Sequence, residues 1–80
     1  MSADDILAKL SDIMQETFNI SGLELAPAMT AKDVKGWDSM SNIRLVVAVE
    51  EAFAVSLSTS EVIGIENVGN FVALIQEKIG

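Results

Sequence analysis

The chain contains no cysteine and no histidine among its 80 residues. Without cysteine it can form no disulfide, and it has neither a thiolate nucleophile nor a thiolate metal ligand. Without histidine it lacks both the base of serine–histidine catalytic groups and the commonest metal-binding side chain. We therefore expect no metal site in the free protein and no hydrolase of the serine–histidine kind. The missing cysteine also fits a reducing compartment.

Positive charge is scarce as well, with five Lys and Arg against 12 Asp and Glu and a formal net charge of −7. Nucleic acids and anionic membranes attract the opposite sign, so we expect no nucleic acid as a partner. No apolar run approaches the roughly 20 residues that a membrane-spanning helix needs, and we expect no membrane insertion. The opening Ser2-Ala3-Asp4-Asp5 does not resemble a secretory signal. These features predict a cytoplasmic protein.

Half of the residues are apolar, which is enough for residues 1–80 to fold as a single domain. The apolar residues recur at three- and four-residue spacing, and strand-like alternation persists nowhere. The pattern predicts an all-α fold, a small four-helix bundle with three longer helices, one short helix and a long first loop. We expect a monomer. The expected helices cover residues 4–18, 39–54, 58–63 and 68–79.

Capping residues mark the ends of these helices. Ser2, Asp38 and Asn67 stand at the starts of the three longer helices, where a side-chain oxygen can accept free backbone N–H groups. Gly64 suits the end of the short helix. The loop 19–38 is unusually long for a compact domain, and such loops often carry function. We expect it to pack on the bundle through Leu23, Leu25 and Met29.

The second helix divides into two faces when its residues are placed at about 100° intervals. The face expected to join the core carries Leu45, Val46, Val49 and Phe53, with Ile43 lying toward it. The other face carries Met40, Arg44, Val47 and Glu51. Two outward apolar side chains bracketed by charges resemble a small docking surface.

The segment Gly36-Trp37-Asp38-Ser39-Met40 lies where the polar loop ends and this helix begins. Asp38 supplies the cap, so the Ser39 hydroxyl has no structural duty and is expected to face water. A helix N-terminus favours an anion such as a phosphate ester. The Asp38 charge opposes that anion, which suggests that Asp38 serves another molecule, for example by holding a metal during modification. A serine enzyme is not expected, because the sequence offers no suitable base for Ser39 and contains no G-x-S-x-G elbow.

On these residues the sequence resembles the acyl carrier proteins. Asp38-Ser39-Met40 matches the family's Asp-Ser-Leu or Asp-Ser-Met, and the helix that follows runs through acidic residues to Phe53, as it does in the family. The resemblance covers essentially the whole chain. It includes the long first loop, the short third helix and the start of the last helix at Asn67-Val68.

The resemblance implies that a phosphopantetheinyl transferase attaches 4′-phosphopantetheine from coenzyme A to Ser39, with Asp38 supporting the loading. The resulting arm carries acyl groups as thioesters to acyl-loading and acyl-transferring or condensing enzymes. The pathways implied are fatty-acid, lipid, polyketide or related biosynthesis, and the chain itself is not an enzyme. The arm would then supply the only thiol.

The resemblance also implies two sets of contact residues. The partner-binding set is Met40, Arg44, Val47, Glu50, Glu51, Leu57 and Ile65. The acyl pocket set is Ile43, Val46, Val62, Ile63 and Ile65. Arg44 and Ser41 stand where housekeeping fatty-acid carriers usually have acidic residues. Because charge complementarity governs partner choice, we expect a specialised carrier.

A second interpretation is a non-covalent helical protein-interaction module without a prosthetic group. It would use the same outward surface around Met40 and Val47. The two interpretations differ in the role of Ser39, whose hydroxyl only the carrier requires.

Overall fold

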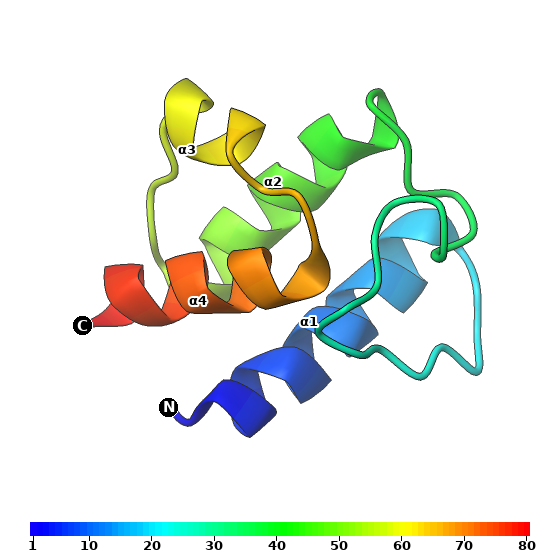
Figure 1. Cartoon of the computed structure of the whole chain (residues 1–80), viewed down its shortest axis with the longest axis horizontal. Helices are drawn as coiled ribbons and strands as arrows, with labels where there is room; N and C mark the ends of the chain where they lie inside the picture. Colours follow the sequence, from blue (N-terminus) through cyan, green and yellow to red (C-terminus); the bar gives the residue numbers. More distant parts are fainter.

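The computed structural model describes residues 1–80 and confirms the predicted all-α architecture with a long loop after the first helix (Figure 1). The helices are α1 (Ala3–Phe18), α2 (Ser41–Phe53), α3 (Thr59–Ile63) and α4 (Val68–Ile79). α1 packs against both α2 and α4, so it is the central element of the bundle. No helix combines the length and the apolar character needed to cross a bilayer.

The core lies where the three longer helices meet. Its fully enclosed side chains are Ile6, Leu10, Met14, Leu45, Val49, Val68, Phe71 and Ile75. They recur at three- and four-residue spacing on each helix, as the sequence predicts, because this spacing keeps side chains on one face. Burying a large apolar side chain contributes about 1.5–3 kcal/mol, so this cluster dominates the stability of the fold.

The observed caps explain the helix boundaries. Ser2 Oγ accepts the Asp5 N–H at the start of α1, and Asn67 Oδ1 accepts the Asn70 N–H at the start of α4. Each cap satisfies one of the backbone donors that the first turn of a helix leaves free. The predicted bounds of α4 are confirmed. α3 begins at Thr59, one position later than expected, with Ser58 as its cap, and α1 begins one position earlier than expected, at Ala3.

The position of Ile43 differs from the prediction, because its side chain is 68% exposed and does not lie toward the core. The buried face of α2 is the row Ser41, Leu45 and Val49, spaced by four residues. Ile43 precedes Leu45 by two residues, which places it roughly 200° away around the helix. Val46 is half-buried at the edge of the same helix.

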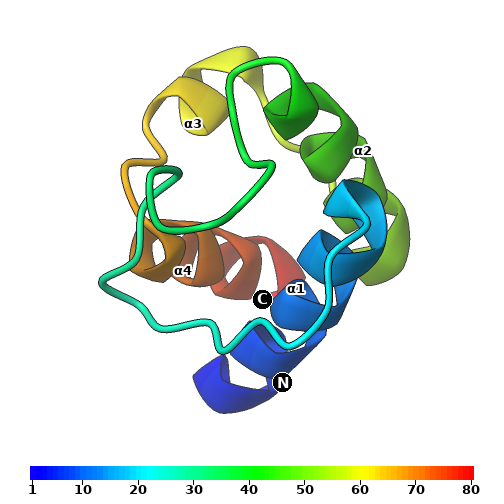
Figure 2. The same cartoon turned by 90° about the vertical axis from the view of Figure 1, so that its right-hand side faces the viewer.

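The loop between α1 and α2 packs across the bundle (Figure 2). Leu23, Leu25 and Met29 lie against the core as expected, and Val34 and Trp37, which periodicity did not single out, are buried in it. The loop also fixes the start of α4, since Val68 N–H donates to the Met29 carbonyl and Gly69 N–H to the Pro27 carbonyl, both at 2.9 Å. The backbone of the loop thus satisfies two of the free donors of α4.

Gly36 allows the loop to close over the end of α1. Its φ is +88°, and a Cβ at this position would lie 3.1 Å from Phe18 Cβ. Both the left-handed backbone and the close approach require glycine. The residue that follows, Trp37, is thereby brought into the core.

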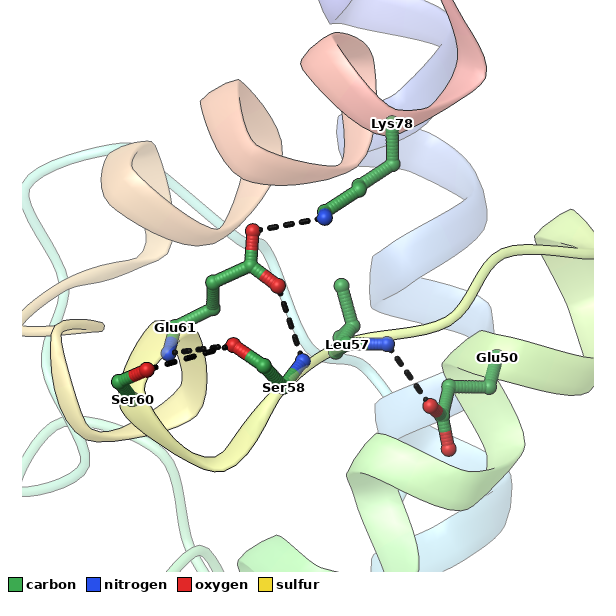
Figure 3. Close-up of polar contacts among 6 residues, drawn as sticks. All are labelled: Glu50, Leu57, Ser58, Ser60, Glu61 and Lys78. Atoms are coloured by element: carbon green, nitrogen blue, oxygen red, sulfur yellow. Dashed lines mark hydrogen bonds and ion pairs between the residues drawn. The ribbon is translucent and has the colours of Figure 1, made fainter.

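α3 has no buried residue and is held mainly by polar contacts (Figure 3). Ser58 and Glu61 form a capping box, in which each side chain accepts the other residue's backbone N–H. The Glu61 carboxylate also pairs with Lys78 of α4 at 2.8 Å. On the other side, Glu50 of α2 accepts the Leu57 N–H at 2.9 Å. Carboxylates of α2 and α3 thus fix the short helix beside the bundle.

The first prediction concerns Gly36. Gly36→Ala should lower the free energy of unfolding by about 1–3 kcal/mol, because the new Cβ meets Phe18 in addition to straining the backbone. Gly22→Ala is the matched control, since Gly22 also has positive φ (+73°) but nothing within 4 Å of its Cβ position. Urea unfolding measures both variants. Equal losses would show that the contact with Phe18 carries no cost.

The second prediction concerns Glu61. The Lys78 ammonium, followed by the Ser58 N–H, lowers the pKa of Glu61 from 4.5 to about 2. Because the pKa of Glu61 is lower in the folded state than in the unfolded state, its ionised carboxylate stabilises the fold at pH values above about 4.5. This stabilisation disappears as the pH falls from about 4.5 to about 2. The stability difference between the wild type and Glu61→Gln should therefore shrink over this range when unfolding is followed by circular dichroism. A difference independent of pH would contradict the assignment.

Candidate functional site

Asp38 stabilises the turn that leads into α2, although the position directly before the helix is Met40 and not Asp38 as predicted. Its Oδ1 accepts the N–H groups of Met40 and Ser41 at 2.9 and 2.8 Å, and its carbonyl accepts the Asn42 N–H at 2.9 Å. Regular α-helix begins at Ser41 and not at Ser39, because the Ile43 N–H bonds to the Met40 carbonyl. Residues 39 and 40 consequently form a turn ahead of the helix.

Ser41 completes this turn from the inside. Its side chain is 4% exposed, and its Oγ accepts the Asp38 N–H at 2.8 Å and donates to the Gly36 carbonyl at 2.6 Å. Ser41 N–H in turn donates to Asp38 Oδ1, so these two residues, three positions apart, cap each other. The Asp-x-x-Ser spacing in the sequence is the signal from which this pair could have been predicted. The expectation that Ser41 replaces an acidic group on the exposed face is therefore wrong, because Ser41 points inward.

Trp37 and Asn42 form a third connection across the turn. The Trp37 indole Nε1–H donates to Asn42 Oδ1 at 2.9 Å, and Trp37 is only 8% exposed. Ser39 lies between these fixed residues, is exposed, and takes no part in the hydrogen bonds of the turn. The chain thus presents a solvent-facing hydroxyl on a turn whose neighbours are held in place.

The electrostatics of the turn favour an ionised Asp38. The Ser41 N–H lowers the pKa of the Asp38 carboxyl, the Met40 N–H and the Arg44 charge act in the same direction, and desolvation opposes them. Both backbone donors bond to Oδ1, which leaves Oδ2 free of bonds within the chain. No cluster of three or more acidic, His or Cys side chains gathers elsewhere to hold a metal. Asp38 can therefore offer one carboxylate oxygen to a metal that another molecule brings.

Two depressions lie near Ser39. A hollow of about 180 Å³ adjoins it, lined by Ala31, Trp37, Asp38, Ser39, Asn42, Ile65 and Glu66. A groove of about 280 Å³ between α2 and the α3 region is lined by Asn42, Ile43, Val46, Val47, Leu57, Thr59, Val62 and Ile63. Four of the residues expected in the acyl pocket, namely Ile43, Val46, Val62 and Ile63, meet in this groove. The fifth, Ile65, lines the hollow beside Ser39.

The residues expected to bind partners lie in two kinds of environment. Met40 is 81% exposed and Val47 48% exposed, and Arg44 and Glu51 are exposed on the same helix. Arg44 forms no ion pair, since the single salt bridge joins Lys78 and Glu61.

The remaining expected partner residues lie around α3 and are less available. Leu57 and Ile65 are half-buried and pack against the core. Glu50 is also half-buried, and its carboxylate accepts the Leu57 N–H. Sequence reasoning missed this structural role of Glu50, because the contact depends on how the connection to α3 folds back.

Comparison with known proteins identifies relatives of this chain. A family model described as the phosphopantetheine attachment site matches residues 8–75. Among solved structures, the solution NMR structure of a holo acyl carrier protein from Geobacter metallireducens is similar, with 27% sequence identity and a TM-score of 0.85. The alignment covers 92% of this chain and 85% of that one, so the likeness extends over the whole fold.

The third prediction tests the inward serine. Ser41→Ala would leave the Asp38 N–H and the Gly36 carbonyl without their buried partner, so unfolding should become easier by about 1–3 kcal/mol. Ser56→Ala, at an exposed position, should change stability by less than about 0.5 kcal/mol. Chemical unfolding of both variants measures the difference. A neutral Ser41→Ala would mean that the reciprocal cap does not hold the turn.

Proposed function

The chain belongs to the phosphopantetheine-attachment family, and we propose that it carries acyl groups as thioesters on a 4′-phosphopantetheine arm joined to Ser39. Members of this family carry the cofactor covalently on a serine and are carriers, not enzymes. The observation that supports Ser39 is its exposed hydroxyl, which is unbonded within the chain and lies on a fixed turn inside the matched segment. The adjoining hollow leaves room for a substituent on that oxygen.

The attachment requires a separate phosphopantetheinyl transferase and coenzyme A. Ser39 Oγ forms a bond to the phosphorus that bears pantetheine, the hydroxyl proton passes to a base of the transferase, and adenosine 3′,5′-bisphosphate leaves. The ionised Asp38 supports this step, because its free Oδ2 can join the magnesium ion held in the complex. This role explains why a carboxylate stands beside a site that becomes anionic.

Once attached, the arm supplies a thiol that forms thioesters with acyl groups. The chain's own contribution is to shelter and present that cargo. The groove beside α3 offers apolar side chains to an acyl chain, including Ile43, Val46 and Val62. The exposed surface formed by Met40 and by Val47 of α2 offers a docking surface to acyl-loading and acyl-transferring or condensing enzymes.

We further propose a specialised carrier that serves a dedicated lipid, polyketide or related pathway. Arg44 supports this proposal, because it places an unpaired positive charge on the docking face of an otherwise acidic chain. Ser41 no longer contributes to the argument, since its side chain faces inward. A partner that suits this face must tolerate or complement a cation opposite Arg44.

The fourth prediction tests attachment. Incubation with coenzyme A and a broad-specificity transferase should raise the intact mass by one phosphopantetheinyl group, and Ser39→Ala should abolish the gain while leaving the helical fold unchanged. Ser56→Ala is the matched control, because it removes an exposed hydroxyl elsewhere and should load like the wild type. Mass spectrometry and circular dichroism provide the two measurements.

An unchanged mass of the wild type, with a known carrier domain modified in the same reaction, would refute the carrier function. The interaction-module interpretation expects another result. In that case Ser39→Ala would retain full function in the cell, while Val47→Glu on the docking face would destroy it.

A further inference from the structure

The hollow beside Ser39 and the groove beside α3 have one lining residue in common, Asn42. Asn42 follows Ser39 by three residues and lies in the first turn of α2. A group tethered to Ser39 that runs along the surface from the hollow into the groove therefore passes this side chain. The position makes Asn42 the junction between the two depressions.

The two depressions differ in chemistry. Three of the seven residues that line the hollow are hydrophobic, against six of the eight that line the groove. Asp38 and Glu66 also line the hollow, and their negative charges favour a neutral polar group there over an anion. The groove suits an apolar chain. Polarity thus changes from mixed to apolar along the path away from Ser39.

The side-chain amide of Asn42 has a defined orientation. An indole N–H is a donor only, so the Asn42 atom that faces Trp37 Nε1 must be the oxygen. Trp37 is buried and keeps that bond in place. The Asn42 Nδ2 group is consequently turned away from Trp37, and it donates no hydrogen bond within the chain while remaining accessible to solvent. It is a pre-oriented donor at the junction.

We propose that the hollow receives the amide-bearing part of the phosphopantetheine arm and that Asn42 Nδ2 donates a hydrogen bond to one of its amide carbonyls. This inference rests on the proposed attachment at Ser39. The arm carries neutral amides between its phosphate and its thiol, so its polarity follows the same order as the path from Ser39 to the groove. Asn42, oriented by Trp37, thereby directs the thioester end toward the apolar side chains near Val46 and Val62.

The test uses the loaded protein, prepared with coenzyme A whose pantetheine is labelled with ¹³C and ¹⁵N. Mass spectrometry first establishes that the arm is attached. NMR should then show arm amide resonances displaced from those of free pantetheine, and nuclear Overhauser contacts from the arm to the Trp37 indole and the Asn42 amide protons. Arm resonances identical to free pantetheine in a fully loaded sample would overturn the placement and leave the attachment at Ser39 intact.

Asn42→Asp is the decisive variant. The aspartate side chain still accepts the Trp37 N–H through a carboxylate oxygen, but it has no N–H donor in place of Asn42 Nδ2. The ratio of docked to free arm, measured from the amide shifts, should fall roughly three- to tenfold, as expected for one hydrogen bond. Asn70→Asp makes the same chemical change at an exposed position of α4 while keeping its acceptor for the Glu66 N–H, and it should leave the ratio unchanged. Equal ratios in the wild type and Asn42→Asp would overturn the role of Asn42.

Discussion

The reciprocal hydrogen bonds between Asp38 and Ser41 are the constraint on which the functional end of this molecule depends. Each side chain accepts the backbone N–H of the other residue, and the Ser41 hydroxyl also holds the Gly36 carbonyl. Ser39 and Met40, the two residues between this pair, are both exposed. Under the proposed attachment at Ser39, a modifying enzyme would meet the hydroxyl already presented and would not need to reorganise the turn to reach it.

Stability and accessibility are divided between different parts of the fold. The three longer helices bury the apolar cluster, whereas α3 contributes no buried residue and is fixed through the carboxylates of Glu50 and Glu61. Small domains have a small free energy of unfolding, and most of it must come from the enclosed core. Elements with few buried contacts open at the lowest free energy. If the groove receives an acyl chain as proposed, its α3 wall can adjust to that chain without disturbing the core around α1.

The sequence predicted the parts of the structure that are periodic or locally capped. Three- and four-residue spacing predicted the apolar stripes of α1 and α4. Polar side chains, which act within one helical turn, predicted the cap of α4 at Asn67 and the capping residue of α3. The exposed Ser39 beside Asp38 followed from the same local reasoning.

Features that depend on how the loop folds back could not be predicted in this way. Val34 and Trp37 are buried because Gly36 closes the loop over α1, and no periodicity marks such contacts. Ser41 was misplaced because residue type suggested a surface position, while its hydroxyl satisfies buried backbone groups. The orientation of Ile43 depended on the exact rotation of α2, which the inward row through Leu45 sets.

The charge distribution narrows the choice of partner in two stages that act over different distances. The net charge of −7 attracts basic surfaces over about a Debye length, roughly 8–10 Å at physiological salt. At contact, a partner meets Arg44 between the exposed Met40 and Val47, without an acidic residue paired to it in the chain. If partners dock on this face as proposed, a uniformly basic surface would be attracted and then repelled at Arg44, whereas a basic surface with a local acidic or neutral site would be accepted. Selection by repulsion at close range is an effective route to specificity, because it rejects related enzymes that long-range attraction cannot distinguish.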